Sequence, residues 1–275
     1  MSRPTVIVPI FNAFGHVKSC LDSLERHSRQ ASILLINDSS TDEKILPLLE
    51  EWIDREPGRS LLNNEENRGF VYSANRGMSA VDGDVVLLNS DTQVSPGWLD
   101  ALARCLATDE SIATATPWSN NGEIVSFPEL CVAAPVPEDL EKIAAIFQSV
   151  GQAYYPELPT AVGFCMAISR RAIDRVGYFD EPTFGLGYGE ENDFCMRAAK
   201  AGMRNVLCDD AYVAHHGGAS FSQRGLQPDS DSMQRLAGKH PEYESLVMEF
   251  IHSDPLAHRR MELAKAFKRG QGAIR

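Results

Sequence analysis

Short apolar runs alternate with amphipathic stretches over roughly the first 110 residues of the chain. The runs are β-branched and nearly continuous, which is typical of strands buried on both faces. The stretches between them have the three- and four-residue apolar spacing of helices. This alternation predicts an α/β fold, in which helices flank both faces of a mostly parallel sheet. The predicted strands are residues 5–10, 33–36 and 85–88, and the predicted helices are residues 17–26, 45–56 and 71–78.

The pattern becomes less regular after this point and turns helical and polar towards the end of the chain. Gly202 stops one of the later helical patterns, at a position typical of a helix C-terminus. The last ~50 residues have no strand pattern and predict a helical C-terminal extension. The predicted helices are residues 140–150, 171–176 and 193–201, and the predicted extended segments are residues 162–169, 206–208 and 212–214.

Polar residues follow each of the first three predicted strands. Asp38 and Asp91 come after the second and third strands, and Asn12 follows the first. Ligands of parallel sheets bind beyond the carboxyl ends of the strands, so these side chains are expected to meet at one edge. Asp91, in Asn89-Ser90-Asp91, can hold a hard divalent cation, and Asp38 can accept a hydrogen bond from a nucleobase or ribose. For both motifs the alternative is a simple turn or helix cap.

An acidic cluster, Glu190-Glu191-Asn192-Asp193, follows a glycine-rich loop. Acidic residues are favoured in the first turn of a helix because they complement the helix dipole. Three carboxyl groups within four residues also repel one another, which raises at least one pKa and suits a general base. The cluster alone leaves open which carboxylate is the base.

His215-His216, followed by Gly217-Gly218, is a second candidate for metal binding. A single histidine is more often structural, but two adjacent histidines at a strand end favour a ligand. The chain contains no HExxH or CxxC motif, which leaves a zinc hydrolase site unsupported.

The bulk composition narrows the class of protein. The 275 residues carry a net charge of −12, which argues against a nonspecific nucleic-acid binder but allows phosphate binding beside a divalent cation. Six scattered cysteines predict buried, reduced thiols and a cytosolic compartment. The apolar segment near the N-terminus is too short for a signal peptide, and no run is long enough to span a bilayer. We therefore expect a soluble, cytoplasmic protein.

Taken in order, seven segments resemble the family 2 glycosyltransferases, which are inverting enzymes with the GT-A fold. In motif style they are closest to the rhamnosyltransferase-like branch, and the resemblance spans residues 4–222. Each motif is weak singly, but seven in the right order make a specific signal. The segments are Val6-Ile7-Val8-Pro9-Ile10-Phe11-Asn12, Asn37-Asp38-Ser39-Ser40-Thr41-Asp42, Asn67-Arg68-Gly69-Phe70 with Asn75, Leu88-Asn89-Ser90-Asp91-Thr92, Gly177-Tyr178-Phe179-Asp180-Glu181, Gly189-Glu190-Glu191-Asn192-Asp193 and His215-His216-Gly217-Gly218.

The resemblance implies a role for each matching residue. Asp91 corresponds to the metal-binding carboxylate of the family's DxD motif, and His215 rather than His216 to a further ligand of Mn²⁺ or Mg²⁺. Glu191 corresponds to the general base, with Glu190 and Asp193 as alternatives. The nucleotide pocket would be formed by Pro9, Asn12, Asp38 and Asn89 and closed by Asn67, Gly69 and Asn75.

The resemblance also implies an organisation and partners. Residues 1–224 would form the GT-A domain, with a nucleotide-binding half at about 1–115, an acceptor half at about 116–224 and the helical extension at 225–275. The donor would be a UDP- or dTDP-sugar, and the acceptor a glycan or lipid-linked glycan in cell-surface polysaccharide synthesis. No nucleic acid is expected. The basic residues of the extension would contact a membrane surface or a partner protein, unless they form a solvated terminal helix; they are Arg259, Arg260, Lys265, Lys268 and Arg269.

Two other functions share some of these features. A metal-dependent nucleotidyltransferase would have a similar sheet and acidic edge, but would need a basic glycine-rich loop for a triphosphate. A non-catalytic sugar-nucleotide-binding module would need no general base. The chain has no lysine-rich glycine loop for a triphosphate, and Asp91 together with the acidic cluster counts against a pure binder, so the glycosyltransferase is favoured over both.

Overall fold

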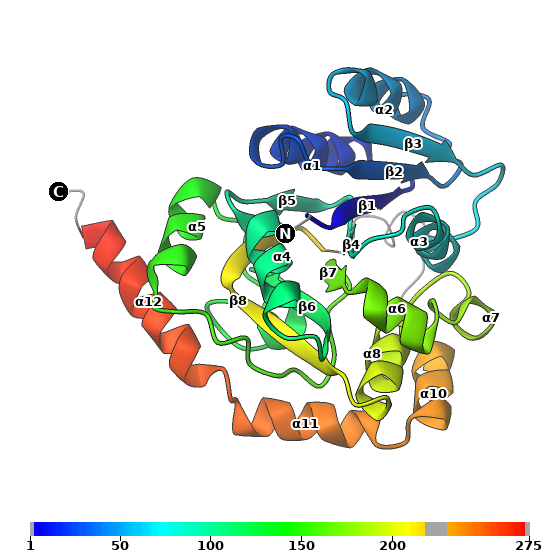
Figure 1. The fold of residues 1–275 in the computed structure, drawn as a ribbon. Helices are drawn as coiled ribbons and strands as arrows, with labels where there is room; N and C mark the ends of the chain where they lie inside the picture. The colour runs from blue at the N-terminus through cyan, green and yellow to red at the C-terminus, as the bar shows by residue number, and fades with distance from the viewer. Residues whose placement is uncertain (1–2, 218–229, 273–275) are drawn as a thin grey trace.

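The computed structural model describes residues 3–217 and 230–272 of the chain. Within these residues, one eight-stranded sheet runs in the order β3-β2-β1-β4-β7-β6-β8-β5, with helices packed around it (Figure 1). The strands are β1 (Thr5–Ile10), β2 (Ile33–Asn37), β3 (Arg59–Asn63), β4 (Val85–Leu88), β5 (Thr92–Val94), β6 (Ile112–Trp118), β7 (Cys165–Ile168) and β8 (Arg204–His215). The helices are α1 (Phe14–His27), α2 (Ile45–Asp54), α3 (Phe70–Ser79), α4 (Trp98–Thr108), α5 (Leu140–Ser149), α6 (Arg170–Val176), α7 (Glu181–Phe184), α8 (Glu190–Lys200), α10 (Ser230–Lys239), α11 (Tyr243–Ser253) and α12 (Ala257–Gly272), with a short 3₁₀ helix η1 (Glu123–Val125).

The sheet is mostly parallel, as the alternating pattern predicts. Strands β3, β2, β1 and β4 pair in parallel, and β6 pairs in parallel with β8. Strand β7 is antiparallel to both of its neighbours, β4 and β6, and β5 is antiparallel to β8. The expected α/β fold is therefore confirmed. The sequence pattern does not predict that β5 and β7 run in the reverse direction.

The core has two layers because the central strands are apolar on both faces. Val6, Val8 and Ile10 of β1 pack into one buried cluster with α1, α2, α4 and α5, and Ile7 packs into another with α3, α6, α8 and α10. Alternate side chains of a strand point to opposite faces, so a continuous apolar run can fill both layers. This explains why the runs at 5–10, 33–36 and 85–88 are correct predictions.

Four elements differ from the sequence predictions. Helix α4 and strand β6 were not predicted, and α8 begins at Glu190 rather than at residue 193. The two extended pieces at 206–208 and 212–214 are parts of one strand, β8. Asp209 interrupts the apolar pattern of β8, but its fully buried carboxylate pairs with Arg259 of α12 at 2.9 Å, so the strand continues through it.

The C-terminal extension packs on the domain rather than standing away from it. Helices α10, α11 and α12 pass along the lower edge and side of the molecule in Figure 1, and Leu236, Leu256 and Leu263 are fully buried. The predicted boundary at 224/225 lies outside the described residues.

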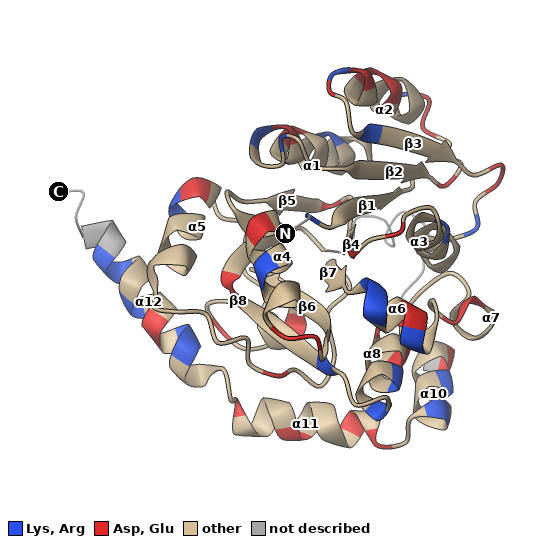
Figure 2. Cartoon of the chain, viewed as in Figure 1, with Lys and Arg blue, Asp and Glu red and all other residues tan. Residues whose placement is uncertain are grey.

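The basic residues of the extension do not all lie on its surface. Figure 2 shows basic residues along α10 and α12. Arg259 and Arg260 are buried and pair with Asp209 and Asp254, at 2.9 and 2.8 Å, whereas Lys265, Lys268 and Arg269 are exposed. The five basic residues therefore do not form one surface patch.

Two further sequence expectations concern the cysteines and the membrane. All six cysteines lie in the described part of the chain and are free; five are buried as predicted, but Cys131 is exposed. Cys131 lies in the irregular segment after η1, outside the strands and helices of the described residues.

No helix within residues 3–217 and 230–272 is long and apolar enough to cross a bilayer.

Candidate active site

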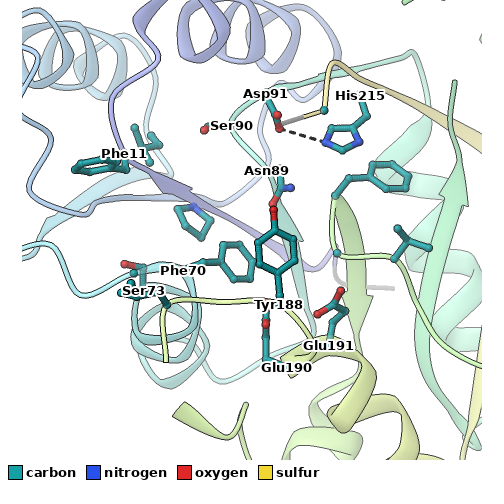
Figure 3. A pocket seen from close by; sticks show the side chains of 18 of the residues that line it. Phe11, Phe70, Ser73, Asn89, Ser90, Asp91, Tyr188, Glu190, Glu191 and His215 are labelled. Atoms are coloured by element: carbon teal, nitrogen blue, oxygen red, sulfur yellow. Dashed lines mark ion pairs between the residues drawn. The ribbon is translucent and has the colours of Figure 1, made fainter. Parts of the chain in front are cut away.

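A cavity of about 350 Å³ opens beyond the carboxyl ends of β1 and β4, bounded by the start of α3 and the start of α8. In Figure 3, Asp91 and His215 lie on one side of the cavity, and Glu190 and Glu191 lie on the other. The chain segments that meet here are far apart in the sequence, as expected for ligand sites of parallel sheets. The sequence-predicted residues that line the cavity are Pro9, Asp38, Gly69, Asn89, Asp91, Glu190, Glu191 and His215.

Asp91 and His215 form the pair best suited to hold a cation. Nε2 of His215 lies 3.4 Å from Oδ1 of Asp91, and Nδ1 lies 2.7 Å from the carbonyl oxygen of Asn121. Antiparallel pairing of β5 with β8 brings the two segments together, because it places Thr92 opposite His215. A metal-binding histidine commonly donates its second ring N–H to a carbonyl or carboxylate, which fixes the ring orientation and leaves the other nitrogen for the metal.

His215 and His216 have different surroundings. The His215 ring stacks on Phe164 with 5.3 Å between the ring centroids. Burial lowers the pKa of His215, but the hydrogen bond and charge of Asp91 outweigh it, so that its pKa is raised. His216 turns towards Gln93, 2.9 Å away, and does not line the cavity. The geometry therefore favours His215 as the ligand.

The donor set fits a hard divalent cation rather than a closed protein metal site. Among residues 3–217 and 230–272, no group of three or more His, Cys, Asp or Glu side chains is arranged to hold a metal. Mg²⁺ is usually held by one or two carboxylates, with water and substrate phosphates completing its coordination. Asp91 and His215 can supply the protein part of such a shell.

Asp38 organises the loop that precedes α3. Its carboxylate is almost fully buried and accepts hydrogen bonds from the backbone N–H groups of Arg68 and Gly69, at 2.9 and 2.8 Å. Nδ2 of Asn64 donates to it at 2.7 Å and to Ser73 at 2.9 Å. Asn64 was missed by the sequence reasoning, although it directly follows β3 at the same edge of the sheet. Asp38 lines the cavity, and its bonds shape the wall formed by Gly69.

The other asparagines predicted for the nucleotide pocket lie outside the cavity lining. Oδ1 of Asn12 accepts from the backbone N–H groups of Thr41 and Asp42, at 2.8 and 3.0 Å, and so holds the loop that carries Asp38. Asn75 exchanges two hydrogen bonds with the backbone of Phe179 and ties α3 to the segment before α7. Asn67 is exposed. Asn12, Asn67 and Asn75 therefore lie around the pocket rather than in its lining.

Glu190 and Glu191 bring two carboxyl groups to the cavity at the start of α8. Burial raises the pKa of Glu191 to about 7, and burial together with the charge of Glu191 raises the pKa of Glu190 well above its usual range. Oε2 of each is buried and has no hydrogen-bond partner among the described residues. A carboxylate that lines a pocket and has a pKa near neutrality can accept a proton from a substrate.

Asp193 has a different environment from its two neighbours. It does not line the cavity, and its fully buried carboxylate lies 2.7 to 2.9 Å from Arg197, Lys239 and His240. Burial raises the pKa of Asp193, but the hydrogen bonds from Lys239, His240 and Arg197 outweigh it and lower the pKa. A carboxylate that is paired with Arg197 and Lys239 and does not line the cavity is unsuited to be the base.

Aromatic side chains form much of the remaining wall and were missed as site residues. Phe11, Phe70, Phe164 and Tyr188 line the cavity, and Figure 3 shows Tyr188 between Asn89 and Glu190. Phe11 directly follows β1 and Phe70 begins α3. Their positions at these strand and helix ends could have predicted that they line the site. Tyr188 has a φ of 73° within the glycine-rich loop, a conformation unusual for a residue with a side chain.

Comparison with known proteins agrees with this fold and site. The family model "Glycosyl transferase family 2" matches residues 5–177. An N-acetylglucosaminyl-diphospho-decaprenol L-rhamnosyltransferase of Mycobacterium tuberculosis is 26% identical over 245 residues, which cover 77% of this chain and 75% of the relative.

Solved structures of other glycosyltransferases share the fold. A mannosyltransferase of Pyrobaculum calidifontis in complex with GDP-Man and Mn²⁺ superposes with a TM-score of 0.62 and 17% identity, over 99% of this chain and 76% of that one. GalNAc-T7 with UDP, GalNAc and Mn²⁺ superposes with a TM-score of 0.63 and 16% identity, over 100% of this chain. The present chain spans only 56% of the GalNAc-T7 chain.

The protein belongs to glycosyl transferase family 2 and has the GT-A fold. Its class is therefore that of a glycosyltransferase, and a rhamnosyltransferase is among its relatives.

Proposed function

We propose that the protein transfers a sugar from a UDP- or dTDP-sugar to an acceptor hydroxyl, with inversion at the anomeric carbon. In this proposal Glu191 is the general base, and Asp91 and His215 hold Mn²⁺ or Mg²⁺. The observation that supports it most is the cavity, in which Asp91 and His215 lie opposite Glu191, whose pKa is raised to about 7.

The charge of the cavity supports the use of a cation. The described residues that line it include five carboxylates and neither lysine nor arginine; the carboxylates are Asp38, Asp91, Glu123, Glu190 and Glu191. Because no cationic side chain of the described residues lines the cavity, a divalent cation would supply the charge that neutralises a nucleoside diphosphate. When bound, the cation stabilises the charge that develops on the leaving diphosphate. A nucleotidyltransferase would face a larger charge from its triphosphate, which makes that alternative less favourable.

The proposed chemistry is a single displacement at the anomeric carbon. Glu191 takes the proton from the acceptor hydroxyl as its oxygen bonds to that carbon, and the bond from the carbon to the diphosphate oxygen breaks. The diphosphate leaves with the electron pair on the opposite side of the sugar, which inverts the configuration. The protein supplies position and charge stabilisation, which are the major contributions to rate for such transfers.

The rhamnosyltransferase relative supports a narrower proposal for the substrates. Its name describes transfer of L-rhamnose to an N-acetylglucosaminyl-diphospho-decaprenol. A deoxyhexose donor and a lipid-linked glycan acceptor for cell-surface polysaccharide are therefore the first pair to try. Such an acceptor would be met at the inner face of a membrane by a protein acting from the cytoplasm.

The test is a screen of labelled UDP- and dTDP-sugars with Mn²⁺, followed by mass spectrometry of transfer and donor hydrolysis products. We expect one donor to be consumed, the reaction to stop when EDTA removes the cation, and Asp91→Ala to lower the rate by at least ~100-fold. Binding of a donor without transfer or hydrolysis would instead support a non-catalytic sugar-nucleotide-binding module.

A further inference from the structure

The first turn of α8 is held from the side opposite the cavity. Glu191 faces the cavity, whereas Asp193, two residues later, lies about 200° further around the helix. Asp193 is fully buried against α10 of the C-terminal extension. One helical turn therefore presents the proposed base on one side and an anchoring carboxylate on the other.

Polar contacts connect this anchor to several elements. Oδ1 of Asp193 lies 2.7 Å from Nζ of Lys239 and 2.9 Å from Nε2 of His240, both at the end of α10. Lys239 also pairs with Asp180, the N-cap of α7, at 2.6 Å. Nδ1 of His240 accepts from Lys200 in the last turn of α8, at 2.9 Å. The end of α10 thus contacts both the first and last turns of α8.

Apolar packing holds the same turn from a second direction. Gly189, which precedes α8, has a φ of 96°, and a Cβ atom there would lie 3.0 Å from the Phe184 ring and 3.9 Å from Leu236. Leu236 of α10 is fully buried. The backbone that leads into Glu190 and Glu191 is therefore packed between α7 and α10.

We propose that α10 positions the general base: Lys239 and His240 hold Asp193, and Asp193 sets the orientation of the turn that carries Glu191. This inference rests on the proposed function of Glu191. Neither Lys239 nor His240 lines the cavity, so both are positioning residues that act through α8. Helix α10 also lies beyond residues 5–177, the part matched by the family model.

A matched pair of variants tests this role. Lys239→Ala removes ion pairs to Asp193 and Asp180 from a side chain that is 33% exposed. Arg204→Ala removes ion pairs to Asp109 and Glu157 from an equally exposed side chain, far from α8's first turn. We expect Lys239→Ala to lower kcat by about 10- to 100-fold with the donor KM nearly unchanged, because small misplacement of a catalytic group has effects of that size.

Arg204→Ala should retain kcat within about twofold, since exposed ion pairs away from the site have little effect. Lys239→Arg, which keeps a cation at this position, should restore most of the rate. The inference is wrong if Lys239→Ala leaves kcat unchanged, or if both alanine variants lower it equally.

Hydrogen exchange provides a readout that does not depend on activity. The amide of Asp193 donates to the carbonyl of Gly189 at 2.9 Å, and it should exchange faster in Lys239→Ala than in Arg204→Ala. If the wild-type protein neither transfers nor hydrolyses any sugar donor, the proposed function fails, while faster exchange would still establish that α10 holds this turn. Equal exchange in the two variants would overturn the anchoring itself.

Discussion

At the scale of single residues, the acidic cluster separates into side chains with different environments. Glu190 and Glu191 line the cavity and are buried, and burial raises both pKa values. Asp193, only two residues further on, meets Arg197, Lys239 and His240 and has a lowered pKa. The helical turn between them directs chemically similar groups into opposite electrostatic surroundings.

The raised pKa of Glu191 leads to a prediction about pH. A general base must be deprotonated, and the pKa of Glu191 is raised from 4.5 to about 7. The kcat/KM of transfer should therefore rise about tenfold per pH unit below about pH 7 and level off above it. Because Glu190 titrates with Glu191, the measured value belongs to the pair.

Two variants check this assignment by steady-state kinetics over a pH series. Glu191→Gln should lower kcat by at least ~100-fold while donor binding remains. Glu50→Gln, on the exposed surface of α2, should change neither the rate nor the pH profile. Full turnover by Glu191→Gln would show that another group is the base.

At the scale of elements, the site depends on how loops at the strand ends pack against one another. Gly69 precedes α3 with a φ of 89°, and a Cβ atom there would lie 2.9 Å from the Cα of Leu186. Its N–H donates to Asp38, and the next residue, Phe70, donates to the carbonyl of Leu186. This single glycine therefore allows the loop after β3 to contact the loop before α8.

Gly69→Ala should weaken both the fold and donor binding. The strained φ and the clash with the Leu186 backbone are expected to lower the free energy of unfolding by about 1–3 kcal/mol. The donor KM should rise because the cavity wall shifts. Gly15→Ala, where nothing lies within 4 Å of the added Cβ, should be neutral or slightly stabilising in denaturant unfolding. Equal effects of the two substitutions would contradict this account of the loop contact.

At the scale of the whole molecule, the C-terminal extension is part of the fold. Arg259 of α12 and Asp209 of β8 form a buried ion pair at 2.9 Å, and backbone N–H groups of Tyr154 and Tyr155 also donate to Asp209. Helix α12 is thereby linked to β8. Two of the five basic residues that suggest a surface patch in the sequence, Arg259 and Arg260, are therefore part of the interior.

Arg259→Ala should destabilise the protein strongly. It leaves the buried carboxylate of Asp209 without its cation, which typically lowers the free energy of unfolding by about 3–5 kcal/mol. Arg3→Ala removes the exposed pair with Asp100 and should lower it by only about 0–1 kcal/mol. Urea unfolding of both variants measures the difference, and similar small losses would show that the buried pair is dispensable.

The hypothesis of membrane contact now concerns only the exposed basic residues of α12. Lys265, Lys268 and Arg269 are exposed, and each cation near an anionic lipid surface contributes about 1 kcal/mol of binding. The wild-type protein should sediment with vesicles containing anionic lipid, and the triple alanine variant should bind them less. Unchanged sedimentation after the triple substitution would remove the membrane role.

The sequence alone was enough to predict the central parallel strands β1, β2 and β4 and the acidic residues of the cavity lining. Buried strands such as 5–10 and 85–88 are readable because apolar residues fill both faces, and parallel strands bring their carboxyl ends to one edge. Asp38 and Asp91 were thus predictable from strand ends alone. The ordered motifs then identified the family that the comparison confirms.

Which polar residues face the cavity depends on the tertiary structure and could not be predicted from the sequence. Asp193 and Arg259 are ordinary charged residues in the sequence, and their burial depends on partners 47 and 50 positions away, His240 and Asp209. Local sequence patterns cannot predict such pairs, because the free energy of a buried charge depends on neighbours that are brought close only by the fold. For the same reason the acidic cluster could be recognised from its residues, whereas the separate roles of its members required the packing of α10 against α8.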